Sequence, residues 1–203
     1  MQTVSPIFDA AYWQARYATP GRAGWDAGRI TPPLRAYFDQ LDGRPQPRIL
    51  IPGAGRAHEA EYLHRLGFQQ VIVADFAPEP LAALLARVPD FPQENLWQVN
   101  FFTLDAPASF DLLIEQTFVS ALHPTQRPAY AQQCARLLRP GGKLVGLLFD
   151  RDFAGATEPP FGGSQAEYAG YFAPYFEFIY FETAHNSLPA RAGHELFICL
   201  QKR

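Results

Sequence analysis

The sequence predicts an α/β fold in which a doubly wound, mostly parallel sheet of seven strands is closed by a C-terminal antiparallel hairpin. Three observations support this prediction. Short apolar runs alternate with helical patterns between residues 49 and 149. A glycine turn directly follows the first of these runs, as in many nucleotide-binding α/β proteins. The last two runs have no helix between them, so they should pair antiparallel, whereas strands separated by helices pair in parallel.

The predicted strands are short runs rich in Val, Ile, Leu and Phe. They cover residues 49–51, 71–74, 96–99, 110–114, 143–149, 176–181 and 195–200. Predicted helices cover residues 59–66, 80–88 and 129–138. The first helix carries apolar residues at helical spacing and stops before Gly67, which is a good C-terminal cap. Pro140 and the two glycines after it should end the third helix.

Composition indicates one globular domain spanning residues 1–203. Apolar residues make up 48% of the chain and charged residues 18%, and the formal charge is −3 without a basic block. This balance favours neither nucleic acid nor an anionic membrane as a partner, so a small-molecule partner is expected. Residues 1–6 do not read as a secretion signal, and no apolar stretch approaches the roughly 18 residues of a membrane span. Cys134 and Cys199 lie far apart, which fits free thiols in a cytoplasmic protein better than a disulfide or a metal site.

The turn Ile51-Pro52-Gly53-Ala54-Gly55 is the strongest local sign of a binding site. Glycine lets the backbone approach a ligand closely, and ligands of open α/β sheets bind at the carboxyl ends of the strands. Asp75 ends the second predicted strand about 20 residues after Gly53, where an acidic residue can hold ribose hydroxyls. The turn and the acid together predict a site for a cofactor that contains ribose.

Ala57 stands where a dinucleotide-binding turn has its third glycine. That glycine permits tight packing beneath a pyrophosphate, which S-adenosylmethionine does not have. The turn therefore favours S-adenosylmethionine over a nicotinamide dinucleotide, while a glycine turn that only permits packing is an alternative. Because alanine is the better residue near a helix start, we expect Ala57→Gly to cost some stability.

Further motifs stand along nearly the whole chain. They are Tyr12-Trp13-Gln14-Ala15-Arg16-Tyr17, Gly24-Trp25-Asp26-Ala27-Gly28 with Pro33-Leu34, Asn100-Phe101-Phe102, Ala121-Leu122-His123-Pro124 with Arg127, and Leu137-Leu138-Arg139-Pro140-Gly141-Gly142. With these motifs the chain resembles the thiopurine S-methyltransferase superfamily, nearest its bacterial and plant thiol and halide methyltransferase branch. The last motif is common to many methyltransferases, whereas the Gly-Trp-Asp and Phe-Phe elements are more diagnostic together.

This resemblance implies a class I methyltransferase fold that uses S-adenosylmethionine and releases S-adenosylhomocysteine. It also implies that residues 1–30 form an N-terminal helical lid over the cofactor. Trp25 would lie against the cofactor, Asp75 would bind the ribose, and Asn100, in place of the usual aspartate, would face the adenine amino group. The expected cofactor-binding residues are Trp25, Gly53, Ala54, Gly55, Asp75, Phe76, Asn100, Phe101, Phe102 and Glu115.

The residues that hold the methyl acceptor are less well defined. Glu115 and Gln116 end the fourth strand where relatives often carry an aspartate and an aromatic residue. The N-terminal rings have near-helical spacing, which fits the core face of a helix, one wall of the acceptor pocket, or both. The candidates for the acceptor pocket are Tyr12, Trp13, Tyr17, Glu115, Gln116 and Phe118. We identify no catalytic base.

Three other residues carry weaker signals. His58 could reach the ligand and Arg127 could bind an anionic acceptor, but at the starts of their helices both are expected to face solvent. His123 lies in a predicted loop, where site residues are common.

The sequence thus predicts a cytoplasmic methyltransferase that acts by in-line displacement on a small soft nucleophile, such as a thiol or a halide or chalcogen acceptor. A thiol with a pKa near about 8.5 is partly ionised at neutral pH, so a dedicated base is not required. One alternative is a non-catalytic module that binds S-adenosylmethionine or S-adenosylhomocysteine, motivated by Ala57, Asn100 and Glu115. Another, a NAD-dependent oxidoreductase, is disfavoured by Ala57 and the closing hairpin. The acceptor's identity and the oligomeric state do not follow from the sequence.

Overall fold

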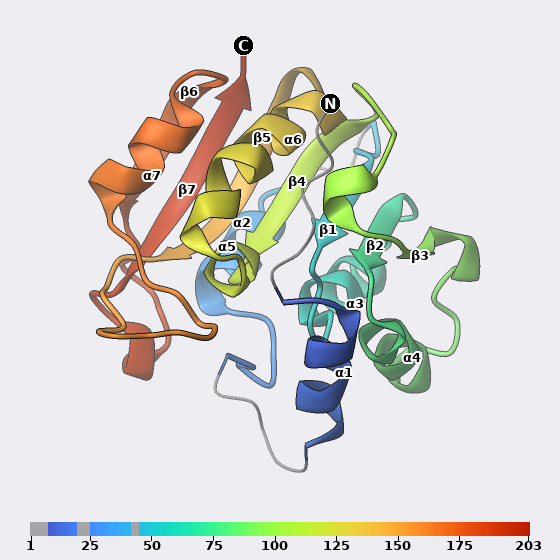
Figure 1. The fold of residues 1–203 in the computed structure, drawn as a ribbon. Helices are drawn as coiled ribbons and strands as arrows, with labels where there is room; N and C mark the ends of the chain where they lie inside the picture. The colour runs from blue at the N-terminus through green and yellow to red at the C-terminus, as the bar shows by residue number, and fades with distance from the viewer. Residues whose placement is uncertain (1–7, 20–24, 42–44) are drawn as a thin grey trace.

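The computed structural model describes residues 8–19, 25–41 and 45–203, and in them seven strands form one twisted sheet (Figure 1). The strands lie in the order β3-β2-β1-β4-β5-β7-β6. They are β1 (Ile49–Pro52), β2 (Val71–Asp75), β3 (Leu96–Gln98), β4 (Phe110–Gln116), β5 (Leu138–Phe149), β6 (Phe176–Thr183) and β7 (Glu195–Lys202). Strand order reverses between β1 and β4, and ligands of open α/β sheets bind at such a switch point.

Strand pairing confirms the predicted fold class. β1 pairs in parallel with both β2 and β4, and β4 pairs in parallel with β5. β7 inserts between β5 and β6 and runs antiparallel to both. The final hairpin therefore closes the sheet beside β5, as the two C-terminal apolar runs predicted.

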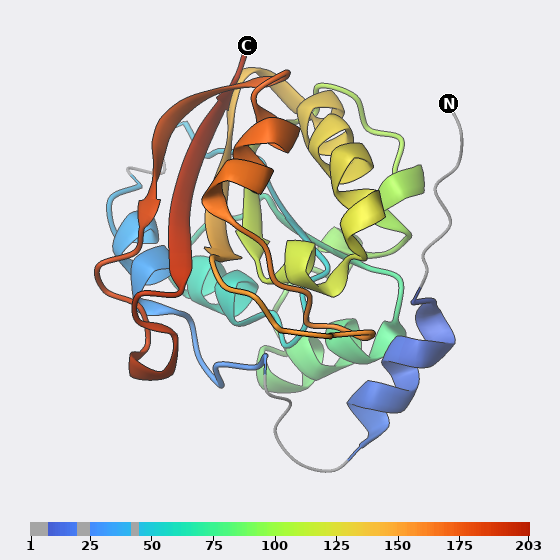
Figure 2. The ribbon, with the colours of Figure 1, turned by 60° about the vertical axis from the view of Figure 1, so that its left-hand side comes forward.

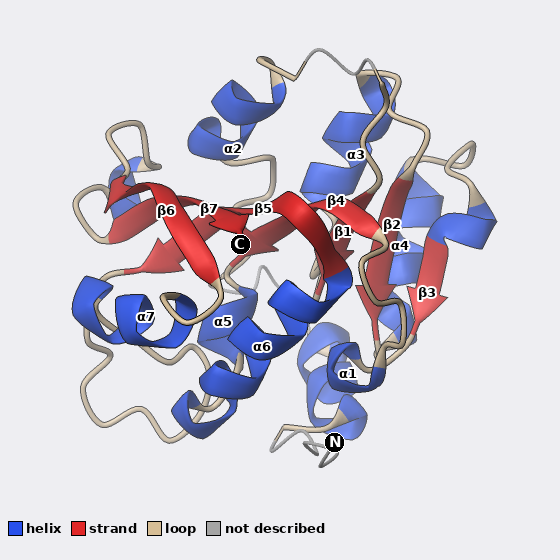
Figure 3. Cartoon of the chain, turned by 90° about the horizontal axis from the view of Figure 1, so that it is seen from above, coloured by secondary structure: helices blue, strands red, loops and turns tan. Residues whose placement is uncertain are grey.

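Helices cover both faces of the sheet (Figure 3). On one face, α2 (Pro32–Phe38), α3 (His58–Arg65) and α4 (Pro78–Arg87) pack on a core that includes Leu34, Leu63 and Leu84. On the other face lie α5 (Phe118–Ala121), α6 (Arg127–Leu137) and α7 (Gln165–Phe172), whose core includes Tyr130 and Phe172. The short 3-10 turns are η1 (Gln93–Asn95), η2 (Phe101–Thr103), η3 (Pro124–Gln126) and η4 (Pro189–Arg191).

One helix lies outside these layers. α1 (Ala10–Ala18) packs beside α4, at the end of the molecule where the glycine turn lies (Figures 1 and 2). The Asp9 side chain begins this helix by accepting a hydrogen bond of 2.9 Å from the Tyr12 backbone N–H. Residues 1–7 and 20–24 of the predicted lid, which include Gly24 of the Gly-Trp-Asp motif, lie outside the described residues.

The fifth strand is longer than predicted. It begins at Leu138, directly after α6, because Leu138 already pairs with Phe110. The register then shifts before Leu112 pairs with Lys143. Pro140 and the following glycines thus lie inside the strand instead of before it. Arg139, Pro140 and Gly141 are exposed, and the two glycines have no side chain, so the sequence of this part of the strand shows no apolar alternation.

Two helices that we did not predict nevertheless begin with recognisable signals. α7 starts after Ser164, whose hydroxyl accepts the Glu167 N–H, which is the Ser-x-x-Glu pattern of a capping box. α2 starts with two prolines in its first turn, a position that tolerates a missing N–H. The two cysteines are buried free thiols, as predicted. Within the part of the chain that the structure describes, no helix has the length and apolar character needed to cross a membrane.

Candidate functional site

A pocket opens at the carboxyl ends of β1, β2 and β4, where strand order reverses. Its empty space of about 1190 Å³ includes open solvent at the mouth. The glycine turn, Asp75 and the Asn100 segment line one side. The end of β4, α5 and the loop after β5 line the other.

The glycine turn is built from left-handed residues at alternate positions. Gly53 and Gly55 both have φ +57°, and Ala57 has φ +54°. A Cβ on Gly53 would lie 2.3 Å from a ring carbon of Phe118, whereas a Cβ on Gly55 would meet nothing within 4 Å. Gly53 is therefore required by packing against Phe118. Gly55 keeps its surroundings open toward the pocket.

Ala57 is not inside the helix, which corrects our expectation about Ala57→Gly. It is the N-cap of α3, in the left-handed region that disfavours L-residues by roughly 1–2 kcal/mol. Glycine would relieve that strain but would lose a buried methyl group. The expected cost of glycine rested on helix propensity, which does not apply at this position.

Asp75 ends β2 with its carboxylate against the glycine turn. The side chain is 5% exposed and accepts a hydrogen bond of 3.0 Å from the Ala77 N–H. Burial raises the pKa of Asp75 to about 6, although the backbone N–H groups of Ala77, Gly55, Phe76 and Ala54 pull it down. A carboxylate surrounded by backbone donors can still accept hydroxyl donors from a ligand.

The Asn100 segment forms a small turn at the end of β3. Asn100 Oδ1 accepts a hydrogen bond of 3.0 Å from the Phe102 N–H and so caps η2. Phe101 is buried, with its ring 5.6 Å from Phe118 and 5.3 Å from Tyr130 between centroids. Asn100, Phe101, Phe102 and Phe76 all line the pocket, together with Ala54.

Four aromatic residues of the N-terminal segment line the pocket: Phe8, Trp13, Tyr17 and Trp25. The Trp25 ring is met edge-on by Trp13 and Tyr17, with centroids at 5.7 and 6.5 Å. Burial raises the pKa of Tyr17 well above its usual value, and the nearby charge of Asp75 adds to this effect. Tyr12 does not line the pocket, because its hydroxyl points to Glu158 instead.

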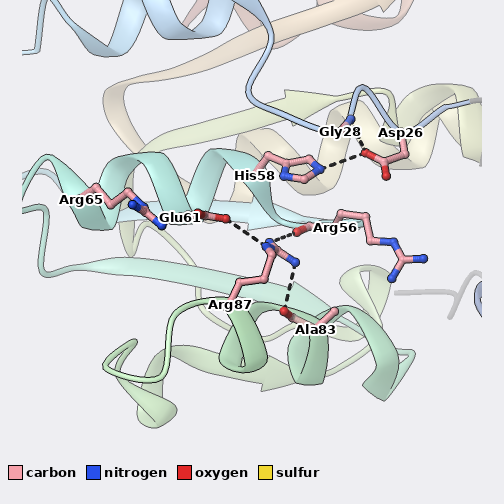
Figure 4. Close-up of polar contacts among 8 residues, drawn as sticks. All are labelled: Asp26, Gly28, Arg56, His58, Glu61, Arg65, Ala83 and Arg87. Carbon is pink, nitrogen blue, oxygen red and sulfur yellow. Dashed lines mark hydrogen bonds and ion pairs between the residues drawn. The ribbon is translucent and has the colours of Figure 1, made fainter. Parts of the chain in front are cut away.

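His58 faces the N-terminal segment, not solvent as expected from the sequence. Its Nε2 lies 2.9 Å from Asp26 Oδ1, and the same oxygen accepts a hydrogen bond of 2.7 Å from the Gly28 N–H (Figure 4). The His58 side chain is 19% exposed and lines the pocket. This contact ties the start of α3 to the chain that follows α1.

Two predicted site residues at the end of β4, Glu115 and Gln116, face different surroundings. Gln116 lines the pocket with Thr117 and Phe118, and Thr117 has a left-handed φ of +62°. Glu115 is fully buried and is not among the lining residues. It accepts hydrogen bonds from the Val119 N–H and the Tyr130 hydroxyl, so it holds α5 and α6 against the sheet. Burial raises the pKa of Glu115 to about 7.

Arg127 and His123 serve local structure. Arg127 is 1% exposed, which corrects the expectation that it is solvated. Its guanidinium lies 3.2 Å from Glu167 and donates to the Phe161 carbonyl at 3.3 Å. His123 Nδ1 lies 2.8 Å from the Thr125 hydroxyl, and its side chain does not line the pocket.

Sequence reasoning missed several lining residues, notably Glu59, Ser120 and Gln126, all of which are buried polar groups. Glu59 left a signal, since it stands four residues before Leu63 and therefore on the apolar stripe of α3. Ser120 and Gln126 gave no such signal, because they line the pocket together with the loop after β5, which is distant from them in the sequence.

Solved structures show the class to which this fold belongs. One is the Burkholderia thailandensis 1,6-didemethyltoxoflavin-N1-methyltransferase with bound 1,6-didemethyltoxoflavin and S-adenosylhomocysteine (TM-score 0.70, 20% identity, covering 98% of this chain and 92% of that chain). Another is an S-adenosylmethionine-dependent methyltransferase from Methanosarcina mazei (TM-score 0.66, 19% identity, 86% and 98% covered). The chain thus has the Rossmann-like fold of class I methyltransferases.

The sequence model of the thiopurine S-methyltransferase family matches residues 8–197. The chain therefore belongs to this family and is an S-adenosylmethionine-dependent methyltransferase. Among curated relatives, the probable thiol methyltransferase 2 of Arabidopsis thaliana is 30% identical over 189 residues, covering 90% of this chain and 79% of the relative. The thiopurine S-methyltransferase of Pseudomonas putida is 28% identical, covering 78% and 80%. Family membership sets aside the NAD-dependent oxidoreductase and the non-catalytic module.

The two glycines of the turn give a first prediction. Alanine at either position should cost roughly 1–2 kcal/mol of unfolding free energy because of the left-handed backbone. Gly53→Ala should cost more than Gly55→Ala, since only there does the new Cβ meet the Phe118 ring. Urea unfolding measures both losses. Adding Phe118→Ala should cancel the excess at position 53, and equal losses for the two single variants would contradict this account.

Glu115 gives a second prediction, on pH. The pKa of Glu115 is about 7 in the folded protein and near 4.5 in the unfolded chain. Between pH 4.5 and 7, Glu115 is therefore protonated in the folded state and ionised in the unfolded state. Its contribution to stability therefore declines as pH rises through that window. Glu115→Gln should gain stability relative to the wild type from pH 5 to 8, by up to about 3 kcal/mol. Urea unfolding at each pH tests this, and a difference that stays constant with pH would refute it.

Proposed function

We propose that this methyltransferase acts on a small soft nucleophile, a thiol or a related selenium, tellurium or halide acceptor. One observation carries the proposal. Among the described residues, the side of the pocket built from the end of β4, α5, η3, the end of β5 and the following loop has no ionisable side chain. The lining residues on that side are Gln116, Thr117, Phe118, Ser120, Ala121, Leu122, Gln126, Phe149, Pro159 and Pro160.

The residues on the opposite side fit S-adenosylmethionine. Gly55 leaves open space where a side chain would stand, and Asp75 presents a buried carboxylate for the ribose hydroxyls. Asn100 would face the adenine, to which an amide can donate and from which it can accept. Trp25 would lie against the sulfonium, since aromatic faces stabilise cations. When bound, the cofactor supplies an electrophilic methyl group for in-line displacement.

The chain's own part in the reaction is alignment and exclusion of water. Phe118, Leu122 and Phe149 supply apolar surface around the acceptor. An alcohol or a protonated amine would need a base to remove its proton, and this wall offers none. A thiol ionises in water near neutral pH, and a halide needs no base. The names of two Arabidopsis thaliana relatives agree with a soft acceptor: the probable thiol methyltransferase 2 and the thiocyanate methyltransferase 1, which is 27% identical over 84% of this chain.

We further propose that residues 1–30 act as a lid on the pocket. The described part of this segment is held over the site by three contacts from distant elements. Arg16 pairs with Glu158 at 3.3 Å, and Asp26 contacts His58 as described above. Arg191 of η4 donates a hydrogen bond of 2.7 Å to the Trp25 carbonyl. Because these contacts surround Trp13, Tyr17 and Trp25, closure of the segment would shield the sulfonium from water.

Turnover on isosteric acceptors tests the proposed substrate class. Thiophenol should be methylated at neutral pH, whereas phenol, which has the same shape, should not. For two thiols of different pKa, kcat/KM should rise with pH up to the pKa of each free thiol and should move when the thiol is changed. A profile fixed at one pH for both thiols would reveal a base in the protein, and efficient methylation of phenol would contradict a soft acceptor.

Hydrogen exchange tests the lid. Amides of α1 should exchange more slowly when S-adenosylhomocysteine is bound, because closure and binding share one free energy. Amides of α7, which contributes no lining residue, serve as the internal control. Trp25→Ala should remove most of the protection of α1 while leaving α7 unchanged. Equal exchange of α1 with and without the ligand would rule out a lid.

A further inference from the structure

Glu59 is a buried acid that the roles described so far do not use. It occupies the first turn of α3, directly after the glycine turn, and lines the pocket. The residue is only 4% exposed. Among the described residues, no side chain forms a hydrogen bond or an ion pair with its carboxylate. Buried acids are normally paired or hydrogen-bonded, so such a group requires an explanation.

The charged neighbours of Glu59 are already engaged with other groups. Asp26 contacts His58 and the Gly28 N–H. Arg191 binds Glu195 at 3.1 Å and the Trp25 carbonyl at 2.7 Å. Burial raises the pKa of Glu59 to about 7, although a hydrogen bond from its own backbone N–H lowers it; Asp26 adds to the rise and Arg191 partly offsets it. Burial therefore destabilises the charged form of Glu59 in the pocket wall, and a bound cation would stabilise it.

We propose that Glu59 binds the α-ammonium group of S-adenosylmethionine. This assignment rests on the proposed position of the cofactor, with its ribose at Asp75 and its chain running over the glycine turn. The amino-acid end of the ligand then lies at the start of α3, where Glu59 faces the pocket. A primary ammonium has three donors and a full charge, and it is the complement that a desolvated carboxylate lacks.

A purely structural role for Glu59 predicts different behaviour. Acids in the first turn of a helix can stabilise it through the helix dipole, so their removal lowers stability. A ligand-binding acid that is buried without a partner should instead cost stability in the free protein. Glu59→Gln should therefore leave the melting temperature of the free protein unchanged or raise it.

Calorimetry with three ligands tests the proposal. S-adenosylhomocysteine carries both the ammonium and the carboxylate, its decarboxylated analogue keeps only the ammonium, and 5′-methylthioadenosine has neither. Glu59→Gln should raise the Kd of the first two ligands about ten- to a hundredfold, the range for a lost charged hydrogen bond. The Kd of 5′-methylthioadenosine should be unchanged. Asp75→Ala should weaken all three ligands alike, because all three keep the ribose.

Glu61→Gln is the matched control. It makes the same chemical change on the same helix, but Glu61 does not line the pocket. Its carboxylate pairs with Arg65 at 2.8 Å and with Arg87 at 3.0 Å (Figure 4). The Kd values of all three ligands should therefore be unchanged in Glu61→Gln.

Each remaining outcome has one meaning. Unchanged binding of S-adenosylhomocysteine by Glu59→Gln would overturn the assignment. Equal weakening of all three ligands would also overturn it, because the damage would then not concern the ammonium. A loss confined to S-adenosylhomocysteine would tie the damage to the ligand's carboxylate instead of its ammonium and would overturn the assignment as well. If the wild-type protein bound 5′-methylthioadenosine as tightly as S-adenosylhomocysteine, the proposed cofactor position itself would fail, which is a separate result.

Discussion

The left-handed turn between β1 and α3 is the constraint from which the arrangement of this site follows. With φ near +57° at Gly53 and Gly55 and +54° at Ala57, the chain leaves the sheet edge and enters α3 within a few residues. The tight path lets the Phe118 ring lie over Gly53 and brings the turn's N–H groups to Asp75. It also fixes where α3 begins, and therefore where His58 and Glu59 stand relative to the pocket. The backbone geometry of this turn therefore decides which polar and charged groups lie at the pocket.

Three buried acids near this edge show how the same side-chain chemistry serves different ends. Glu115 accepts hydrogen bonds from the Val119 N–H and the Tyr130 hydroxyl, and these bonds hold α5 and α6 against the sheet. Asp75 is partly satisfied by backbone N–H groups and keeps acceptor capacity toward the pocket. Glu59 has no side-chain partner among the described residues, and the backbone donor to its carboxylate is its own N–H. Burial raises the pKa of each, but only the neighbouring donors reveal which acid is structural and which awaits a ligand.

The sequence predicted those features that depend on residues close together along the chain. The glycine turn and the acid at the end of β2 lie within one β-α-β unit, and both line the pocket as predicted. His58 and Arg127 were misjudged, because the groups that bury them, Asp26 and Glu167, lie 32 and 40 residues away. Glu115 and Gln116 are adjacent but project to opposite sides of β4, so one enters the core while the other reaches the pocket. Long-range partners and strand faces, more than local propensity, decided these outcomes.

The hydrogen bond from Arg191 to the Trp25 carbonyl joins residues 166 positions apart. On a ribosome, Trp25 therefore emerges long before its anchor. β5 likewise waits for β7, its neighbour on one side. The pocket should consequently be complete only after Arg191 and β7 have emerged, and chains stalled before residue 191 should leave Trp25 and its neighbouring aromatic residues open to chaperones.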